Sequence, residues 1–367
     1  MMTREPLYTP GKTGRYHRCL LLNKQLIFSR YLTIKDTVML QARLVFSLYS
    51  RQLRLSCGAL LICGWSSASL AETFVLPPQD SDVVGEVHVI KARYEDTLSD
   101  IARRYNVGYN EIVLANPGVD PWLPGEGREI NLPTQYVLPN APREGVVVNI
   151  PEMRLYYYPK IQPGQKAVVV TYPISVGKMD WNTPLGVTKI TAKTEKPSWT
   201  PPESIRKEHA DRGDFLPKVV APGAGNPLGK HALRLGLGSY LIHGTNNPYG
   251  VGMRVTHGCV RLYPEDIAQL FERVAIGTNV HFVNQPYKAG WRDGVLYIES
   301  HPPLEEELAG YTVSRTPVIK AILSVESREG AVVDWSKTMQ VAEARNGVPT
   351  AISSRANDVV ALSFVGK

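Results

Sequence analysis

Cysteine is scarce in this sequence, and only one cysteine lies outside the N-terminal region. The chain of 367 residues contains four cysteines. Cys19, Cys57 and Cys63 fall within residues 1–71, which leaves Cys259 as the lone thiol of the remainder. This scarcity excludes a disulfide-stabilised scaffold. In an oxidising compartment, a lone thiol pairs with another molecule, stays buried and inert, or is reactive.

An excess of basic charge is missing from most of the chain. The formal net charge is +7, but residues 1–71 hold ten basic and two acidic residues, a net +8. The remaining residues hold 31 basic and 32 acidic side chains and are nearly neutral. A nucleic-acid partner therefore loses its electrostatic support, and we expect none.

The sequence also lacks a long hydrophobic run near its start. Two arginines precede the apolar residues 55–65, and small residues follow up to Ala71. The run is shorter than the roughly 20 residues that span a bilayer as a helix. We predict that residues 1–71 are an N-terminal extension and secretory signal peptide, with an uncleaved anchor as the alternative. A start at Met39 instead of Met1 would give a leader of ordinary length.

Residues 85–133 have the pattern of a small β-α-α-β unit. Strand-like residues 86–90 and 129–132 flank a helical stripe at positions 98, 101, 102 and 105 and a second short helix over 109–114. We expect Asp96 to be the N-cap of the first helix.

This unit resembles LysM, a glycan-binding module. The residues that carry the resemblance are Asp96-Thr97-Leu98, Ile101-Ala102, Tyr105, Ile112, Asn116-Pro117, Pro124-Gly125 and Ile130-Leu132-Pro133. Glu95 and Glu126 stand where the family usually has Gly and Gln. The resemblance implies binding of the peptidoglycan glycan, with a spacer that no longer binds as the alternative.

Residues 145–285 are rich in Val, Ile, Thr and Tyr and predict a mainly β domain. Strand-like segments cover 146–150, 154–158, 167–175, 187–193, 232–235 and 239–242. A polar, proline-rich insertion at 196–229 is too long for an ordinary connection and indicates a functional element. Residues 286–367 form a C-terminal extension without an assigned role, in which 291–298 resembles a strand.

The segment 241–262 carries the chemistry of the domain. Nucleophilic Cys259 would need a base, because a free thiol is only slightly ionised at neutral pH. His243 and His257 are both candidates, and the N–H groups around Gly258 could bind an oxyanion. Arg261 suits a carboxylate. No fourth ligand stands at zinc-like spacing from these histidines and the cysteine, so we expect no metal and no cofactor.

The same segment is similar to the YkuD-type L,D-transpeptidases, in particular the ErfK/YbiS-like subgroup. The matching motifs are His243-Gly244-Thr245, Thr256-His257-Gly258-Cys259-Val260-Arg261-Leu262, Gly177, Thr183-Pro184-Leu185-Gly186, Trp199-Thr200-Pro201-Pro202 and Asn226-Pro227-Leu228-Gly229. The resemblance implies a β-sandwich with short helices over 145–285.

The resemblance also implies roles for individual residues. Cys259 is the nucleophile, His243 the proton donor and acceptor, and His257 an auxiliary. The Gly258 backbone belongs to the oxyanion hole. The substrate-binding residues are Arg261, Gly244, Thr245 and Thr256.

The activity implied is attack on a peptidoglycan tetrapeptide stem in the periplasm of a Gram-negative bacterium. D-alanine leaves, and the acyl group passes to an amine of a second stem peptide or of an outer-membrane lipoprotein that ends in lysine. The subgroup favours lipoprotein anchoring. An L,D-carboxypeptidase that uses the same thioester and a noncatalytic wall-binding protein are the alternatives.

Overall fold

The computed structural model describes residues 72–76, 81–179, 181–308, 315–325 and 331–354. The chain divides into units of residues 1–66 and 67–367, and all described residues belong to the second unit. The predicted extension and signal peptide therefore lie outside the described residues. In the part that is described, no helix has the length and apolarity needed to cross a membrane.

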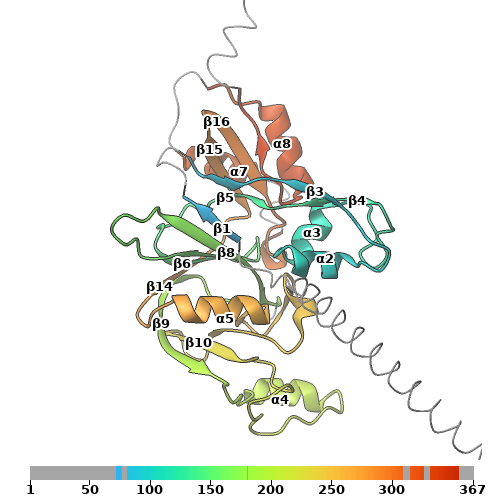
Figure 1. Cartoon of the computed structure of the whole chain (residues 1–367), viewed down its shortest axis with the longest axis vertical. Helices are drawn as coiled ribbons and strands as arrows, with labels where there is room; N and C mark the ends of the chain where they lie inside the picture. The colour runs from blue at the N-terminus through green and yellow to red at the C-terminus, as the bar shows by residue number, and fades with distance from the viewer. Residues whose placement is uncertain (1–71, 77–80, 180, 309–314, 326–330, 355–367) are drawn as a thin grey trace, which may run out of the picture. The chain divides into compact units, whose positions relative to one another are not determined.

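The β-α-α-β unit follows the predicted order. Its elements are β3 (His88–Lys91), α2 (Leu98–Arg104), α3 (Tyr109–Ala115) and β4 (Glu129–Leu132), and β3 pairs antiparallel with β4 (Figure 1). Leu98, Ile101, Ile112 and Ile130 are fully buried in its core. The helical spacing of apolar residues in the sequence thus corresponds to the buried face of α2.

The predicted start of α2 is wrong by one residue. Thr97 is the N-cap: its hydroxyl accepts from the N–H of Asp100 at 3.1 Å, and the Asp100 carboxylate accepts from the N–H of Thr97 at 3.2 Å. This capping box satisfies two free helix donors at once. The Asp96 carboxylate pairs with Arg104 instead. The helix ends at Arg104, so Tyr105 is the C-cap and stays 37% exposed.

The central domain is one sheet of ten strands that closes on itself. The strands are β1 (Glu72–Val75), β6 (Gly145–Asn149), β7 (Arg154–Tyr158), β8 (Val168–Gly177), β9 (Gly186–Glu195), β10 (His231–Leu235), β11 (Leu241–His243), β12 (Arg254–Thr256), β13 (Val260–Leu262) and β14 (Asn279–Val283). The strand order is β1-β8-β13-β11-β10-β9-β14-β6-β7, and the sheet closes because its last strand, β7, also pairs with β8. The sheet folds over a single apolar core, which confirms the predicted mainly β sandwich.

Alternate residues of β7 serve two cores. Leu155 and Tyr157 face the interior of the sandwich, whereas Tyr156 and Tyr158 pack outward against a second apolar cluster. That second cluster includes residues of two short paired strands, β2 (Val83–Gly85) and β5 (Gln135–Val137). Both faces of this strand are therefore covered, which is why its sequence lacks polar alternation.

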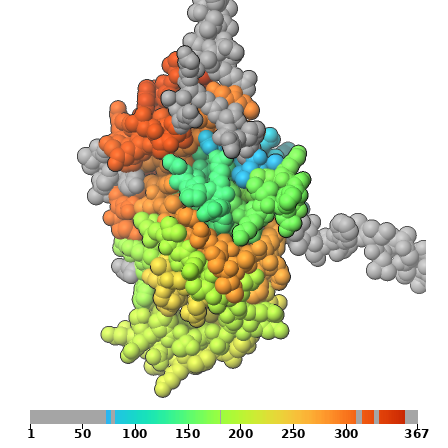
Figure 2. Space-filling view, turned by 90° about the vertical axis from the view of Figure 1, so that its left-hand side faces the viewer, coloured from blue at the N-terminus to red at the C-terminus, as the bar shows by residue number. Residues whose placement is uncertain are grey.

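Two helices belong to the sandwich. α5 (Pro264–Arg273) starts with proline in its first turn, as the sequence predicts, and buries Ile267 and Leu270. α4 (Glu203–Ala210) lies in the 196–229 insertion. The insertion lies at the opposite end of the unit from the C-terminal elements (Figures 1 and 2).

The C-terminal extension builds a small layer with its own apolar core. Its elements are β15 (Tyr287–Arg292), β16 (Val295–Ser300), the short helix η2 (Glu305–Glu307), α7 (Thr316–Leu323), α8 (Trp335–Ala344) and β17 (Thr350–Ala351). Residues 309–314, 326–330 and 355–367 of this extension lie outside the described residues.

The single strand predicted over 291–298 is wrong. The chain reverses at Asp293 and Gly294, whose φ angles are 52° and 77°, and Arg292 pairs with Val295. Two successive positive φ angles are the mark of a type I′ hairpin turn, for which Asp-Gly is a preferred sequence.

A buried ionic cluster joins this layer to the sandwich. The Lys288 ammonium lies 2.8 Å from a Glu152 oxygen and 2.9 Å from a Glu299 oxygen, and it donates to the Val137 carbonyl at 2.7 Å. All three charged side chains are almost fully buried. Removing one partner from such a cluster costs about 3–5 kcal/mol, so the extension is an integral part of the unit.

Candidate active site

Adjacent strands place two of the predicted site residues, His243 and Arg261, beside each other. β11 and β13 are parallel neighbours, and their register sets His243 opposite Arg261. Cys259 immediately precedes β13, two residues before Arg261. Paired residues in a sheet project to the same face, so residues far apart in sequence meet at one end of the sandwich.

The Cys259 thiol is a free, half-buried group. Burial raises its pKa above the ordinary value, while a backbone hydrogen bond at Leu241 and the charge of Arg261 oppose that rise. Desolvation disfavours the thiolate more than these contacts favour it. The resting group is therefore the neutral thiol at neutral pH.

His243 is also neutral, and its tautomer follows from its contacts. The Nδ1 atom lies 2.6 Å from the Gly244 carbonyl oxygen, which can only accept, so Nδ1 carries the proton. Burial and then the charge of Arg261 lower the pKa of His243 to about 3, against the effect of the Gly244 carbonyl. The Nε2 atom is thus a proton acceptor at any pH near neutrality.

A threonine shapes the backbone at the cysteine. The Thr256 hydroxyl donates to the Cys259 carbonyl at 2.6 Å and accepts from the Gly258 N–H at 3.2 Å. Gly258 has φ +97°, and a Cβ there would lie 2.6 Å from the Tyr240 ring, so the position requires glycine. The Gly258 N–H has a partner in this structure. The Gly258 N–H could therefore bind an oxyanion only after its hydrogen bond to the Thr256 hydroxyl breaks.

His257 faces the insertion. Its Nε2 lies 2.7 Å from a Glu208 oxygen of α4, and its ring packs edge-on against Trp181 at a centroid distance of 4.8 Å. Glu208 also pairs with Lys178 at 2.8 Å. Hydrogen bonds from Lys178 and then His257 lower the pKa of Glu208 to about 2. Sequence analysis missed Glu208 and Lys178, because neither stands in a motif or at a regular spacing from Cys259.

The remaining predicted binding residues differ in their surroundings. The Thr245 hydroxyl donates to the Asn247 carbonyl at 3.1 Å and accepts from the Asn247 N–H at 2.9 Å, while the Gly244 N–H donates to the His231 carbonyl at 3.1 Å. These contacts hold the loop after β11. Arg261 differs, because its buried Nε has no hydrogen-bond partner among the described residues.

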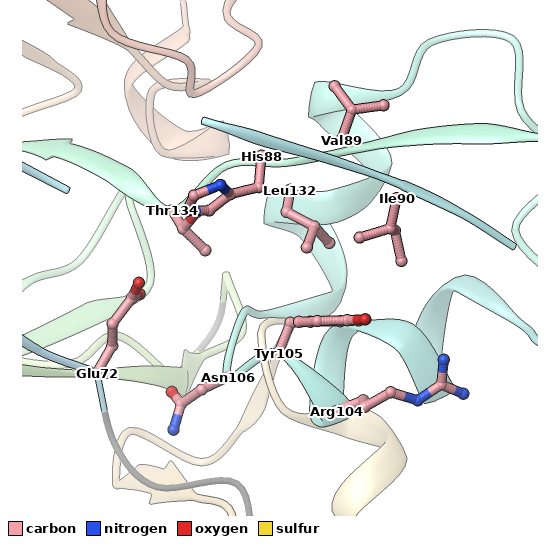
Figure 3. Close-up of a pocket in the computed structure, with 9 residues that line it drawn as sticks. All are labelled: Glu72, His88, Val89, Ile90, Arg104, Tyr105, Asn106, Leu132 and Thr134. Atoms are coloured by element: carbon pink, nitrogen blue, oxygen red, sulfur yellow. The ribbon is translucent and has the colours of Figure 1, made fainter. Parts of the chain in front are cut away.

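Two of the cavities among the described residues lie away from Cys259. The first, of about 480 Å³, lies between the β-α-α-β unit and β1 and is lined by residues that include Glu72, His88, Tyr105 and Thr134 (Figure 3). Burial raises the pKa of Glu72 to about 7, although Arg154 opposes the shift. The second, of about 350 Å³, lies between the β15 edge and α7. Neither is lined by a predicted site residue.

One group of potential metal ligands occurs among the described residues. Glu152, Glu299 and His301 place one ligand atom each within 4.8 Å of one another. The Lys288 ammonium already contacts both carboxylates, and His301 Nε2 lies 2.6 Å from Glu299. Burial opposes ionisation of Glu299, but Lys288 and His301 hold its pKa below the ordinary value. Lys288 therefore already supplies the positive charge that a bound metal ion would bring to these carboxylates.

Known proteins match the chain over both domains. Residues 143–282 match the L,D-transpeptidase catalytic domain (YkuD), and residues 90–132 match the LysM domain. Three relatives from Escherichia coli K12 match over most of their length. Probable L,D-transpeptidase YcfS is 42% identical over 76% of this chain and 88% of its own. Probable L,D-transpeptidase ErfK/SrfK is 38% identical over 83% and 98%, and probable L,D-transpeptidase YbiS is 39% identical over 82% and 98%. The resemblance drawn from the motifs is confirmed: the chain belongs to the L,D-transpeptidase family of enzymes and carries a LysM domain.

Proposed function

We propose that this enzyme is a cysteine L,D-transpeptidase that acts on peptidoglycan tetrapeptide stems in the periplasm. One observation carries the proposal. A neutral His243 imidazole lies on β11, a neutral Cys259 thiol immediately precedes the neighbouring strand β13, and the His243 tautomer leaves Nε2 as the acceptor. The uncharged imidazole can accept the thiol proton at Nε2 as the sulfur attacks, which is the role of a general base.

Acylation follows from this pair. The Cys259 sulfur attacks the carbonyl carbon at the L-centre of the stem as His243 Nε2 takes the thiol proton. The bond from that carbonyl carbon to the nitrogen of D-alanine then breaks. His243 returns the proton to the leaving nitrogen, so D-alanine departs with an uncharged amino group, which water then protonates, and a thioester remains on Cys259.

Deacylation needs an acceptor amine. Its nitrogen attacks the thioester, a new amide bond forms, the bond to sulfur breaks, and the amine proton returns through His243 to Cys259. We propose the side chain of a C-terminal lysine on an outer-membrane lipoprotein or a second stem peptide as the acceptor. The similarity to ErfK/SrfK and YbiS supports the first, since this subgroup resemblance implies lipoprotein anchoring.

Arg261 is the proposed anchor for a substrate carboxylate. Its buried Nε lacks a partner among the described residues, and burial lowers its pKa even though the nearby Cys259 opposes that change. A carboxylate would satisfy this donor and restore a favourable environment for the charge. Stem peptides carry such carboxylates beside the bond to be broken.

The LysM domain is the proposed glycan-binding part. Tyr94 is 81% exposed in the loop between β3 and α2, and Trp122 is 66% exposed in the loop between α3 and β4. Exposed aromatic faces bury large apolar area at low entropic cost, which suits stacking on sugar rings. A spacer role remains the alternative for this domain.

Product analysis tests the function. Protein lacking residues 1–71 is incubated with disaccharide tetrapeptide and a peptide that ends in lysine. We expect free D-alanine and a product in which the acyl group is joined to the lysine amine. Tripeptide as the sole product would identify a carboxypeptidase, and no turnover with retained wall binding would identify a noncatalytic protein.

The same assay assigns the base. We expect His243→Ala to lower turnover about 10²- to 10⁴-fold, the usual contribution of a general base. His257→Ala should have a milder effect, because His257 bonds to Glu208 in this structure. A larger loss of turnover in His257→Ala than in His243→Ala would show that His257 is the base.

A further inference from the structure

The turn between α2 and α3 lies against the loop that leads to the proposed nucleophile. The N–H of Tyr109 donates to the Val251 carbonyl at 3.1 Å, and the N–H of Asn110 donates to the Gly252 carbonyl at 3.1 Å. A Cβ on Gly108 would lie 2.9 Å from the Cα of Gly252. Two glycines thus allow two backbones from different domains to touch, which any side chain would prevent.

The same LysM face also holds the segment that follows the nucleophile. Arg103 forms a bidentate pair with Glu265, with N–O distances of 2.8 Å and 3.1 Å. The buried Asn106 amide donates to an Asp266 oxygen at 2.9 Å. Both acids lie in the first turn of α5, directly after β13. The LysM domain therefore contacts the chain on both sides of Cys259.

A buried ion pair fixes this LysM face to the sandwich. Arg154 of β7 and Glu111 of α3 form two contacts of 2.7 Å, and their side chains are 0% and 7% exposed. Arg154 also donates to the Thr171 hydroxyl at 2.9 Å, and Glu111 accepts from the Gly108 N–H. The turn at Gly108 is thus tied to β7 and β8 as well as to the loop.

The contacted loop is coupled to the cysteine backbone. Val251 and Gly252 lie just before β12, which ends at Thr256. The Thr256 hydroxyl bonds to the Cys259 carbonyl at 2.6 Å. His243 belongs to β11, a different strand. A shift at Gly252 would therefore reach the Cys259 backbone through β12 and Thr256.

We propose that the LysM domain positions Cys259 relative to His243, in addition to any glycan that it binds. Gly108 and Gly252 are the positioning residues of this contact. The inference rests on the proposed catalytic function of the cysteine–histidine pair. Small displacements matter at such a pair, because a misplacement of about 1 Å costs about 10²-fold in rate.

Gly108→Ala tests the contact. The backbone at Gly108 has φ −82°, which alanine adopts freely, so the new methyl acts by pushing on Gly252, at 2.9 Å, and less strongly on the Glu111 carboxylate, at 3.2 Å. Acylation of Cys259 by a carbapenem is followed by intact mass over a range of concentrations. We expect the limiting acylation rate to fall about 10- to 100-fold with little change in the half-saturating concentration. Gly225→Ala is the matched control, since a Cβ there meets nothing within 4 Å.

A charge exchange supplies a second variant that does not disturb packing. Arg103→Glu should slow acylation, and adding Glu265→Arg should restore it, because the pair is partly exposed and can be reversed. Unchanged acylation in Gly108→Ala, or a double exchange no faster than the single one, would overturn the inference. If the carbapenem does not acylate Cys259 in the wild-type protein, the proposed function is wrong. That result differs from an unchanged acylation rate in the variants, which would contradict only the positioning role.

Discussion

At the scale of single residues, burial determines how Cys259 and His243 react. Burial raises the pKa of the thiol and lowers the pKa of the imidazole. Both shifts favour the uncharged forms, so the resting site differs from enzymes that keep a thiolate–imidazolium pair. Arg261 acts on both groups in the same sense, since its charge lowers both pKa values.

The pH dependence of alkylation follows from these shifts. Only the thiolate reacts with iodoacetamide, and the pKa of Cys259 lies above the ordinary 9.0. The alkylation rate should therefore keep rising with pH beyond 9, without a plateau between pH 5 and 8. Cys259→Ser gives the blank, because Cys259 is the lone thiol after residues 1–71. A midpoint below pH 7 would show that the site holds an ion pair at rest.

At the scale of elements, α4 is held beside the site through one carboxylate. Glu208 joins Lys178 and His257 with contacts of 2.8 Å and 2.7 Å. Its folded pKa of about 2 is below the ordinary value, so this contribution is complete above about pH 4.5 and is lost as pH falls through 2. The carboxylate therefore stays ionised at any pH near neutrality.

Glu208→Gln separates this contact from the rest of the helix. We expect faster amide hydrogen exchange over 203–210 and acylation of Cys259 that is slower by a few-fold, because His257 loses a charged partner. Glu203→Gln makes the same exchange at an exposed position in the first turn of the same helix and should change both readouts much less. Equal rates of amide hydrogen exchange in the two variants would contradict the claim that Glu208 holds α4 in place.

The regular elements were the easiest part to predict from sequence. The residues of β4 and β7 match the predicted ranges 129–132 and 154–158, because apolar and β-branched residues in short runs report burial. The cap at Thr97 was missed because Asp96 is an equally good cap by type, and only the reciprocal bond with Asp100 decides. The turn at Asp293-Gly294 was missed because the prediction relied on the run of apolar residues and not on the Asp-Gly pair, which is typical of a hairpin turn.

Some residues of the site can be predicted from the sequence and others cannot. His243 and Cys259 stand in a motif, so both could be named as site residues from the sequence, whereas the pairing of β11 with β13 that sets His243 opposite Arg261 could not. Glu208 reaches His257 from an insertion without periodicity, and its contact depends on how 196–229 folds. Long-range polar contacts of this kind leave no spacing in the sequence.

At the scale of the whole molecule, buried charges join the parts of residues 67–367. Arg154 with Glu111 ties the LysM domain to the sandwich, and Lys288 with Glu152 ties the C-terminal layer to it. Truncating one partner of such a pair leaves a charge unpaired inside the protein, at a cost of about 3–5 kcal/mol. The domains are therefore expected to unfold together rather than as independent modules.

The central claim is that Cys259 forms a thioester with the stem peptide. The most direct measurement is the intact mass of the protein lacking residues 1–71 during turnover of disaccharide tetrapeptide, followed by peptide mapping. The account predicts a transient adduct on Cys259 with the mass of the substrate less one alanine, and no adduct in Cys259→Ser. Release of D-alanine by Cys259→Ser at the wild-type rate, or turnover without an adduct on Cys259, would contradict it.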